Sequence, residues 1–338
     1  MIKFNQIWLA FVFVLLLQQI GKAQDPQFSQ FYAAPMYLNP AFTGNTEQAR
    51  LAANYRKQWL KVPGAFTSYI FSYDQFLRKY KSGVGLMFIN DNAGSGALRF
   101  KSIGGLYSYV FHITRSVGVR VGLRASFISR NVDFFRLRFA DQILRDDPFS
   151  TIEKFDRGRN TYFDFGTGAI IFSENYWGGF SLDHLNRPNE SFMGQESLLP
   201  IKYTVQGGYR YVLSRDPKGF SREDITAVAI YKGQLEWDQI DLGAYYKYRM
   251  SMIGLWYRGI PGLKSYVPGY ANNDAIVIMV GLQLKDFFHV GYSYDVTISK
   301  LGIGTQGSNE ISLIYEFAQA DYKRNGKKQD FIIPCTKF

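Results

Sequence analysis

Large apolar side chains alternate with small or polar ones along the last quarter of the chain. In the run 275–285, every second position from Ile276 to Leu284 is aliphatic, and the intervening positions include Gly281 and Gln283. Alternation at period two places successive side chains on opposite faces of a β-strand. One continuous apolar face opposite a small or polar face is typical of a strand with lipid on one side. This stretch therefore predicts a transmembrane β-barrel.

The same alternation recurs from Arg50 onward. Most of the runs are near the length of about 9–11 residues that a tilted strand needs to cross a bilayer. An even number of strands is what a bacterial single-chain barrel requires when both of its ends lie in the periplasm. The chain is thus predicted to be all-β, with an antiparallel barrel of about fourteen strands across 50–318. The runs are 50–59, 65–75, 83–91, 98–112, 117–129, 161–173, 176–183, 200–214, 223–232, 237–248, 251–257, 275–285, 288–295 and 309–318.

The lengths of the connections give a second test of this fold. If the mature N-terminus is periplasmic, four long connections lie outside the cell, namely 130–160, 184–199, 258–274 and 296–308. Long outer loops with short periplasmic turns are the usual asymmetry of outer-membrane barrels. The pattern predicts a protein of the cell outer membrane with both termini periplasmic. Three connections depart from it, namely 60–64, 215–222 and 233–236.

Composition narrows the class of protein further. Aromatic residues make up 17% of the chain, which fits the aromatic girdles that mark both membrane interfaces. No internal apolar run approaches the roughly 20 residues of a spanning helix. A formal charge of +11 often indicates nucleic acid as a partner. An exported chain does not meet nucleic acid, so we expect contacts with anionic lipid headgroups or acidic partners instead.

The two ends of the chain differ from the alternating region. Residues 1–23 combine a positive start, an apolar core and a small-residue pattern, which predicts a secretory signal peptide cleaved before Gln24. A short N-terminal membrane anchor is the alternative. The tail 319–338 is basic and predicted to be periplasmic. It contains Cys335, the only cysteine of the chain, so no intramolecular disulfide can form.

Residues 24–49 carry three prolines and many aromatic side chains. Proline interrupts helices and central strands, so we expect an extended segment that is neither. The aromatic content favours a segment docked against or inside the barrel, where it would plug the lumen or cap its periplasmic end. A disordered lead-in is the alternative.

The alternation also assigns the charged residues of the strands to one of the two faces. A lysine or arginine that faced lipid near the bilayer midplane would cost about 2–4 kcal/mol, so these charges should point inward. Both signs in one confined space predict a paired and largely filled interior rather than a wide pore of a single sign. The predicted lumen charges are Arg120, Arg124, Arg210, Lys247, Asp74, Asp164, Asp241, Asp295 and Glu316.

The long outer connections combine charged and aromatic side chains. The connection 130–160 is too long for a simple turn, and loops of this length are usually functional or disordered. We expect these connections to dock a partner protein. The candidate docking residues are Phe134, Phe135, Arg136, Arg138, Tyr266 and Tyr270.

The histidines form no catalytic set in the sequence. His289 shares its parity with Ser293 and Asp295, but a hydrolase needs its nucleophile, base and orienting group within hydrogen-bond reach. Along an extended strand these positions are spread over about 20 Å, at about 3.4 Å per residue. His112 and His184 are not accompanied in the sequence by a set of residues with the spacing of metal ligands. We therefore expect no enzyme activity, no metal and no cofactor.

Several motifs carry a family resemblance. Asp25-Pro-Gln-Phe-Ser-Gln-Phe-Tyr32 and Pro35-Met-Tyr-Leu-Asn-Pro-Ala-Phe-Thr-Gly44 resemble the opening signature of the PorP/SprF family, which belongs to the type IX secretion system of the Bacteroidota. Asn309-Glu-Ile-Ser-Leu313 is similar to the last-strand motif of that family, and Cys335-Thr-Lys-Phe338 to its ending. The family often has His at the position of Asn309 and Pro at the position of Thr336, and the second departure leaves the role of Cys335 open. The positions that carry the N-terminal signature are Asp25, Pro26, Phe28, Ser29, Gln30, Tyr32, Pro35, Leu38, Asn39, Pro40 and Gly44.

The resemblance implies a function that the alternation alone does not show. It implies a non-enzymatic outer-membrane component of protein secretion or gliding motility. The implied partners are outer-membrane lipid, a secreted adhesin or other exported protein with a type IX C-terminal domain, and a periplasmic lipoprotein or ring component of the machine. A transport channel for small hydrophobic or polar solutes is the alternative function of such a barrel.

Overall fold

A computed structural model of the chain describes residues 25–46, 49–62, 64–94, 98–146, 151–152, 158–192, 196–215, 221–260, 272–285, 287–299, 302–317 and 332–334. The predicted signal peptide at 1–23 lies outside these residues. So do Tyr266, Tyr270, Cys335 and all of the tail 319–338 except 332–334.

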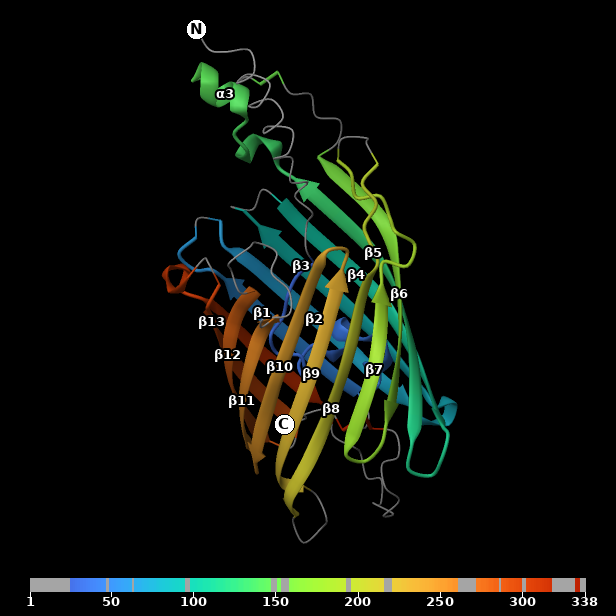
Figure 1. Ribbon diagram of the computed structural model, residues 1–338. Helices are drawn as coiled ribbons and strands as arrows, with labels where there is room; N and C mark the ends of the chain where they lie inside the picture. The colour runs from blue at the N-terminus through green and yellow to red at the C-terminus, as the bar shows by residue number, and fades with distance from the viewer. Residues whose placement is uncertain are drawn as a thin grey trace, which may run out of the picture.

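Fourteen antiparallel strands form one closed barrel (Figure 1). Each strand pairs with its neighbours in the sequence, and β14 pairs with β1 to close the ring. Each of the fourteen predicted runs is a strand, so the predicted fold is confirmed. The strands are β1 Ala49–Gln58, β2 Phe66–Leu77, β3 Ser82–Ala93, β4 Leu98–His112, β5 Gly118–Val132, β6 Arg159–Phe172, β7 Tyr176–Asp183, β8 Lys202–Arg215, β9 Ser221–Gln234, β10 Trp237–Tyr248, β11 Ser251–Ile260, β12 Asn272–Lys285, β13 Phe288–Thr297 and β14 Ser308–Glu316.

Several strands are longer than the apolar alternation indicated, and β5, β6 and β11 are examples. β5 ends at Val132 and β6 begins at Arg159, and this hairpin extends beyond its neighbours at the top of Figure 1. β11 continues past its predicted end at 257 to Ile260. Charged or polar residues interrupt the apolar pattern at these ends, but backbone pairing continues. In β11 the ladder passes through a register shift at Gly259 and still pairs with β12.

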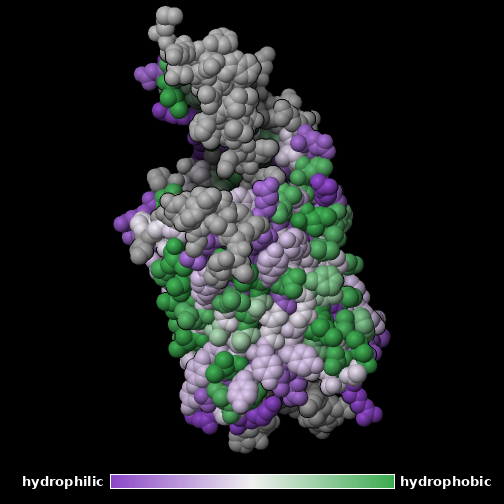
Figure 2. All heavy atoms as spheres, in the orientation of Figure 1, coloured by the Kyte–Doolittle hydropathy of each residue, from purple (hydrophilic) through white to green (hydrophobic). Residues whose placement is uncertain are grey.

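Side chains alternate between an exposed outer face and a buried inner face along the strands. In β12, Ile278 and Val280 are exposed, whereas Val277 and Met279 are buried. The charged residues follow the same rule, since Arg124 in β5 is buried on the inner face. Figure 2 shows hydrophobic side chains gathered over the strands and hydrophilic ones towards both ends of the visible face. The outer surface thus has the apolar character that lipid requires.

The two ends of the barrel differ in the length of their connections. At one end, here the long-connection end, β5 joins β6 through 133–158 and β7 joins β8 through 184–201. At the other, here the short-turn end, β4 joins β5 through 113–117 and β10 joins β11 through 249–250. Short helical elements occupy several connections, namely η2 Arg78–Tyr80, η3 Phe134–Arg136, α3 Ala140–Arg145 and η4 Ile303–Thr305. Within the described ranges, no helix has the length and apolar character needed to cross a membrane.

The segment before the barrel is not extended throughout, which corrects the prediction from its prolines. It contains the helical turns α2, Pro35–Leu38, and η1, Pro40–Phe42. Proline is favourable at the first position of a helix, because its fixed φ suits the helix and its missing N–H would have no helical partner there. Pro35 and Pro40 each begin a turn, so they start helical structure rather than prevent it.

Arginine in place of Ile278, at the outward-facing centre of β12, is expected to lower the free energy of unfolding by about 2–4 kcal/mol, because it puts a charge into hydrocarbon. The same change at Leu284, on the same face near the strand end, should cost only about 0–1 kcal/mol. Equilibrium urea unfolding of Ile278→Arg and Leu284→Arg in lipid vesicles measures both. Equal losses would contradict the assignment of this face to lipid.

Candidate functional site

Residues 25–46, here called the N-terminal segment, cross the inside of the barrel from one end to the other. Asp25 lies at the long-connection end, beside His184 and Lys202. Gly44 lies at the short-turn end, where its N–H donates to Asp74 of β2 at 2.8 Å. No residue of the segment is exposed. In Figure 1 its blue ribbon is visible behind the front strands.

The N-terminal segment runs in the opposite direction to β1, the strand that follows it. The sequence predicts both chain ends on one side of the membrane, and β1 does begin at the short-turn end, where β14 finishes. The N-terminal segment, however, turns back through the barrel. Asp25 therefore lies at the end opposite to the start of β1.

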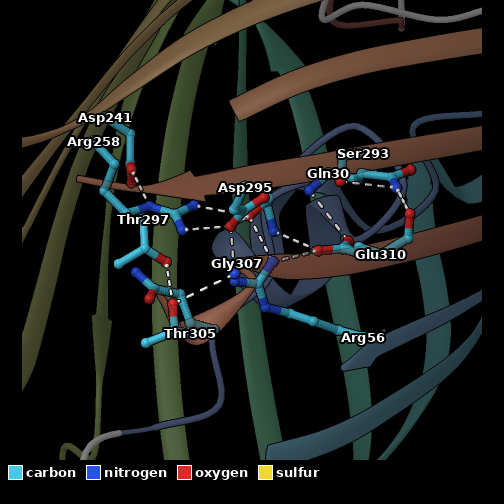
Figure 3. A network of polar contacts seen from close by, with 12 residues as sticks. Gln30, Arg56, Asp241, Arg258, Ser293, Asp295, Thr297, Thr305, Gly307 and Glu310 are labelled. Carbon is cyan, nitrogen blue, oxygen red and sulfur yellow. Dashed lines mark hydrogen bonds and ion pairs between the residues drawn. The ribbon is translucent and has the colours of Figure 1, made fainter. Parts of the chain in front are cut away.

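Ser29 is held near the long-connection end by carboxyl groups of two adjacent strands. Its N–H donates to Glu310 of β14 at 2.7 Å, and its hydroxyl donates to Asp295 of β13 at 2.7 Å. Arg56 of β1 joins these carboxyl groups, 2.8 Å from Asp295 and 3.3 Å from Glu310. Figure 3 shows Arg56 reaching toward both carboxylates. The segment is thereby bonded to the three strands where the barrel closes.

Arg258 extends this network to the next strands. Its guanidinium lies 3.2 Å from Asp295 and 2.8 Å from Asp241 of β10 (Figure 3). Lys232 of β9 lies 3.0 Å from Asp241. The Ser29 cluster consists of Ser29, Arg56, Lys232, Asp241, Arg258, Asp295 and Glu310.

The Ser29 cluster balances three carboxyl groups against three basic side chains. Five of these six are nearly inaccessible to solvent, and Lys232 is only slightly exposed. Removing one partner of such a buried pair typically costs about 3–5 kcal/mol, because the other charge remains unpaired. The cluster therefore fixes the position of Ser29 against the wall.

A second balanced network holds Asp25. His184 donates from Nδ1 to Asp164 of β6 at 2.8 Å, and its Nε2 lies 3.1 Å from Asp25. Lys202 donates to Asp25 at 2.6 Å and lies 3.7 Å from Asp183. Arg124 completes the network, 2.6 Å from Asp183. The Asp25 cluster consists of Asp25, Arg124, Asp164, Asp183, His184 and Lys202.

The charge states of the Asp25 cluster depend on one another. Burial would lower the pKa of His184, but the carboxylates of Asp25 and Asp164 raise it to about 9. Burial would likewise raise the pKa of Asp25, but Lys202 and His184 hold it well below its ordinary value. At neutral pH, His184 is therefore a cation that donates from both ring nitrogens to carboxylates.

Gln30 and Tyr32 bond to the inner face of β13 and β14. The Gln30 amide donates to the Glu310 carbonyl at 2.8 Å and to Ser293 at 3.2 Å. Its oxygen accepts from the hydroxyls of Tyr32 at 2.7 Å and Ser312 at 2.5 Å. Leaving a buried amide donor or acceptor without a partner costs free energy. These hydrogen bonds therefore fix the position of the Gln30 side chain.

Asn39 links η1 to the opposite wall. Its side-chain oxygen accepts from the N–H of Ala41 and so caps the helical turn, while its amide donates to the Phe180 carbonyl of β7 at 2.9 Å. The preceding carbonyl, of Leu38, accepts from Ser181 at 2.9 Å. Nearer the start of the segment, the Pro26 carbonyl accepts from Tyr37, and the ring of Phe28 packs edge-on against Tyr37.

The short-turn end carries its own anchors. Asp74, which accepts from Gly44, is paired with Arg50 of β1 at 2.9 Å. Arg120 of β5 donates to the Thr43 carbonyl at 3.3 Å. The segment is thus held by charged groups at both of its ends.

Glycines of the wall allow the segment to approach closely. A Cβ at Gly122 would lie 2.3 Å from the backbone of Pro40, and one at Gly83 would lie 2.2 Å from the carbonyl of Thr43. Both distances are far below van der Waals contact, so any larger residue would push the segment away. Four strands contribute such inward-facing glycines, namely Gly83, Gly122, Gly168 and Gly291.

The predicted lumen charges separate into two groups. Arg124, Asp164, Asp241 and Asp295 belong to the two clusters, while Arg120 and Asp74 contact the segment at the short-turn end. The rest share the inward parity but are only half-buried near the short-turn end, away from both clusters. These are Arg210, Lys247 and Glu316.

Several residues of the clusters were absent from the predicted set. Arg56 and Glu310 lie on the inward parity of their runs, so the alternation contained the signal. Arg258 fell in a predicted loop, because the run was ended one residue before it. His184 lies in a connection, where parity gives no information. The missed residues are Arg56, Asp183, His184, Lys202, Lys232, Arg258 and Glu310.

The β5–β6 connection carries exposed apolar side chains. Phe135 is 103% exposed and Leu144 of α3 is 86% exposed. Of the other docking candidates, Phe134 is half-buried and Arg138 is exposed, and Arg136 is exposed and paired with Asp133 at 3.2 Å. We call the exposed apolar residues Phe135, Leu137, Ile143, Leu144 and Ile152 the rim patch.

Ser293 and Asp295, which share the parity of His289, both contact the N-terminal segment. His289 is buried, whereas Ser293 bonds to Gln30 and Asp295 bonds to Ser29 and two arginines. Within the part of the chain that the structure describes, no three or more His, Cys, Asp or Glu side chains are grouped to hold a metal ion.

Comparison with known proteins gives one family and several distant barrels. The family described as "Type IX secretion system membrane protein PorP/SprF" matches residues 20–315. None of the curated proteins matches the chain. The CymD monoaromatic hydrocarbon channel has a TM-score of 0.49 at 11% identity, over 89% of this chain and 95% of its own. A Pseudomonas aeruginosa FadL homologue has a TM-score of 0.45 at 10% identity, over 82% of this chain and 94% of its own. The KdgM porin in complex with disordered oligogalacturonate has a TM-score of 0.38 at 8% identity, over 80% of this chain and 99% of its own.

The Asp25 cluster predicts a pH dependence of stability. Because the pKa of His184 is raised in the folded barrel, its contribution to the free energy of unfolding is complete below about pH 6.5. That contribution is lost as the pH rises through about 9. The contribution of Asp25, whose pKa is lowered, is present above about 4 and is lost in acid. We expect the free energy of unfolding to fall by about 1–3 kcal/mol between pH 6.5 and 10. Urea unfolding of the native chain and of His184→Gln measures this, and equal slopes in the two proteins would contradict the assignment.

Proposed function

Since this chain belongs to the PorP/SprF family of type IX secretion system membrane proteins, we propose that it is a non-enzymatic outer-membrane component of that machinery. Its barrel is closed by its own N-terminal segment. Its long-connection end docks an exported protein with a type IX C-terminal domain, such as a secreted adhesin. Its short-turn end faces the periplasm and a lipoprotein or ring component of the machine.

The course of the N-terminal segment is the observation that carries this proposal. The segment bonds to strands on opposite sides of the ring, with Ser29 on β13 and β14, Asn39 on β7, and Gly44 on β2. A solute would have to displace two charge-balanced clusters and the backbone packed against the wall glycines. Such a barrel works through its ends rather than through its lumen.

The rim patch supports a docking role at the long-connection end. Large exposed apolar side chains gathered in one connection are typical of protein interaction sites, and aromatic and arginine side chains are enriched in interfaces. The patch lies on a hairpin that extends beyond the neighbouring strands (Figure 1). Its residues therefore stand clear of the lipid-facing band.

The docking role predicts the effect of charges in the rim patch. Phe135→Asp combined with Leu144→Asp should reduce the exported protein recovered with the detergent-solubilised barrel by roughly ten-fold or more, as expected when interface anchors are lost. Quantitative proteomics of the purified complex measures this. Tyr80→Asp is the matched control, because Tyr80 is 61% exposed at the short-turn end. Undiminished recovery from the double variant would exclude the rim patch as the docking surface.

Closure of the lumen predicts low conductance. In planar bilayers the native chain should show no large, steady current, whereas deletion of 25–46 should open one. Gly122→Met keeps every residue of the segment but blocks its approach to β5, so it should also raise conductance. Heat-modifiable mobility on gels shows whether each variant is a folded barrel. A steady open current through the native chain would favour a transport channel for small hydrophobic or polar solutes instead.

A further inference from the structure

The last described residues, Ile332–Pro334, return to the inside of the barrel. Ile333 is 0% exposed, and Pro334 is also buried. Ile333 bonds to Asn45, which lies near the short-turn end of the N-terminal segment and is itself 0% exposed. In the sequence these residues are an apolar stretch within an otherwise basic tail.

Asn45 holds Ile333 through two hydrogen bonds to its backbone. The N–H of Ile333 donates to Asn45 Oδ1 at 2.8 Å, and Asn45 Nδ2 donates to the Ile333 carbonyl at 3.3 Å. A side-chain amide carries a donor and an acceptor side by side, so it can pair with both polar groups of one extended residue, as an adjacent strand would. This contact selects an extended backbone and does not depend on the side chain.

The surroundings of the bound residue add a preference for side chains. Ile333 belongs to the same buried apolar cluster as Phe42, Phe76 and Trp177. The next residue, Pro334, has no N–H, so its burial leaves no backbone donor without a partner. The site thus suits an aliphatic residue followed by proline.

The occupant is separate from the ladder of the barrel. The ring closes through β1 and β14 without residues 332–334. β14 ends at Glu316, and the connecting residues 317–331 can span up to about 50 Å when extended. Release and rebinding of the tail therefore require no change in the pairing of the strands.

We propose that Asn45 and the apolar interior beside it form a binding site for an extended aliphatic peptide segment, and that residues 332–334 are its exchangeable occupant. A partner segment of the same chemistry competes with the tail for this site. The proposal does not rest on docking at the rim patch, which lies at the opposite end.

A peptide in trans tests the site directly. The probe is a fluorescent synthetic peptide of residues 329–338 that carries Cys335→Ser, added to a chain that ends at residue 328, in detergent. Fluorescence anisotropy should show saturable binding to the shortened chain and roughly ten-fold weaker binding when Asn45→Ala removes both hydrogen bonds. A scrambled peptide of the same composition separates binding at the site from partition into micelles. Equal binding of the two peptides, or equal binding with and without Asn45, would overturn the proposal.

The full chain tests exchange of the tail without truncation. In a Cys335→Ser background, Ile333→Cys places the only thiol at the buried position. Maleimide labelling of this thiol should be slow, and it should become roughly ten-fold faster with Asn45→Ala or with excess probe peptide. Thr114→Cys, at an exposed turn, is the control and should be labelled rapidly in every case. A rate at position 333 that neither change alters would overturn the proposal.

Discussion

The closed ring of backbone hydrogen bonds is the constraint on which the rest of this structure depends. In lipid each backbone polar group needs a partner within the protein, so a spanning sheet must have no open edge. The pairing of β14 with β1 meets this requirement. Once the ring is closed, period-two alternation sends one set of side chains to lipid and the other to the interior. The apolar outer face and the polar inner face are two consequences of the same geometry.

The N-terminal segment supplies hydrogen-bond and charge partners for polar side chains on the inner face of the barrel. Many inward-facing side chains are charged, and buried charges are tolerated only when they are paired and hydrogen-bonded. Ser29 and Asp25 complete clusters whose other members come from the wall. Gly83 and Gly122 show the converse adaptation, since the wall omits side chains where the segment passes. Segment and wall therefore form one packed unit.

The alternation along the chain was sufficient to predict the strands. It could not predict which side chains contact one another in the folded barrel. The alternation located all fourteen strands and the inward position of Arg124 and Asp241, because parity is a property of adjacent residues. It could not show that Arg56 meets Asp295, because that contact depends on the register across β1, β14 and β13. His184 gave no signal at all, since its partners come from β6 and from Asp25. The prolines misled because Pro35 and Pro40 start helical turns instead of preventing them.

The seam between the first and last strands is bridged from within. Arg56 and Glu310 are register partners across this seam, and Ser29 bonds to both of their side chains. Ser29 lies 281 residues from Glu310 in the sequence, and joining parts of the chain so far apart carries a large loop-closure entropy. The hydrogen bonds of Ser29 thus lie across the pair of strands that closes the ring. Opening the barrel between β1 and β14 would therefore also break contacts of the N-terminal segment.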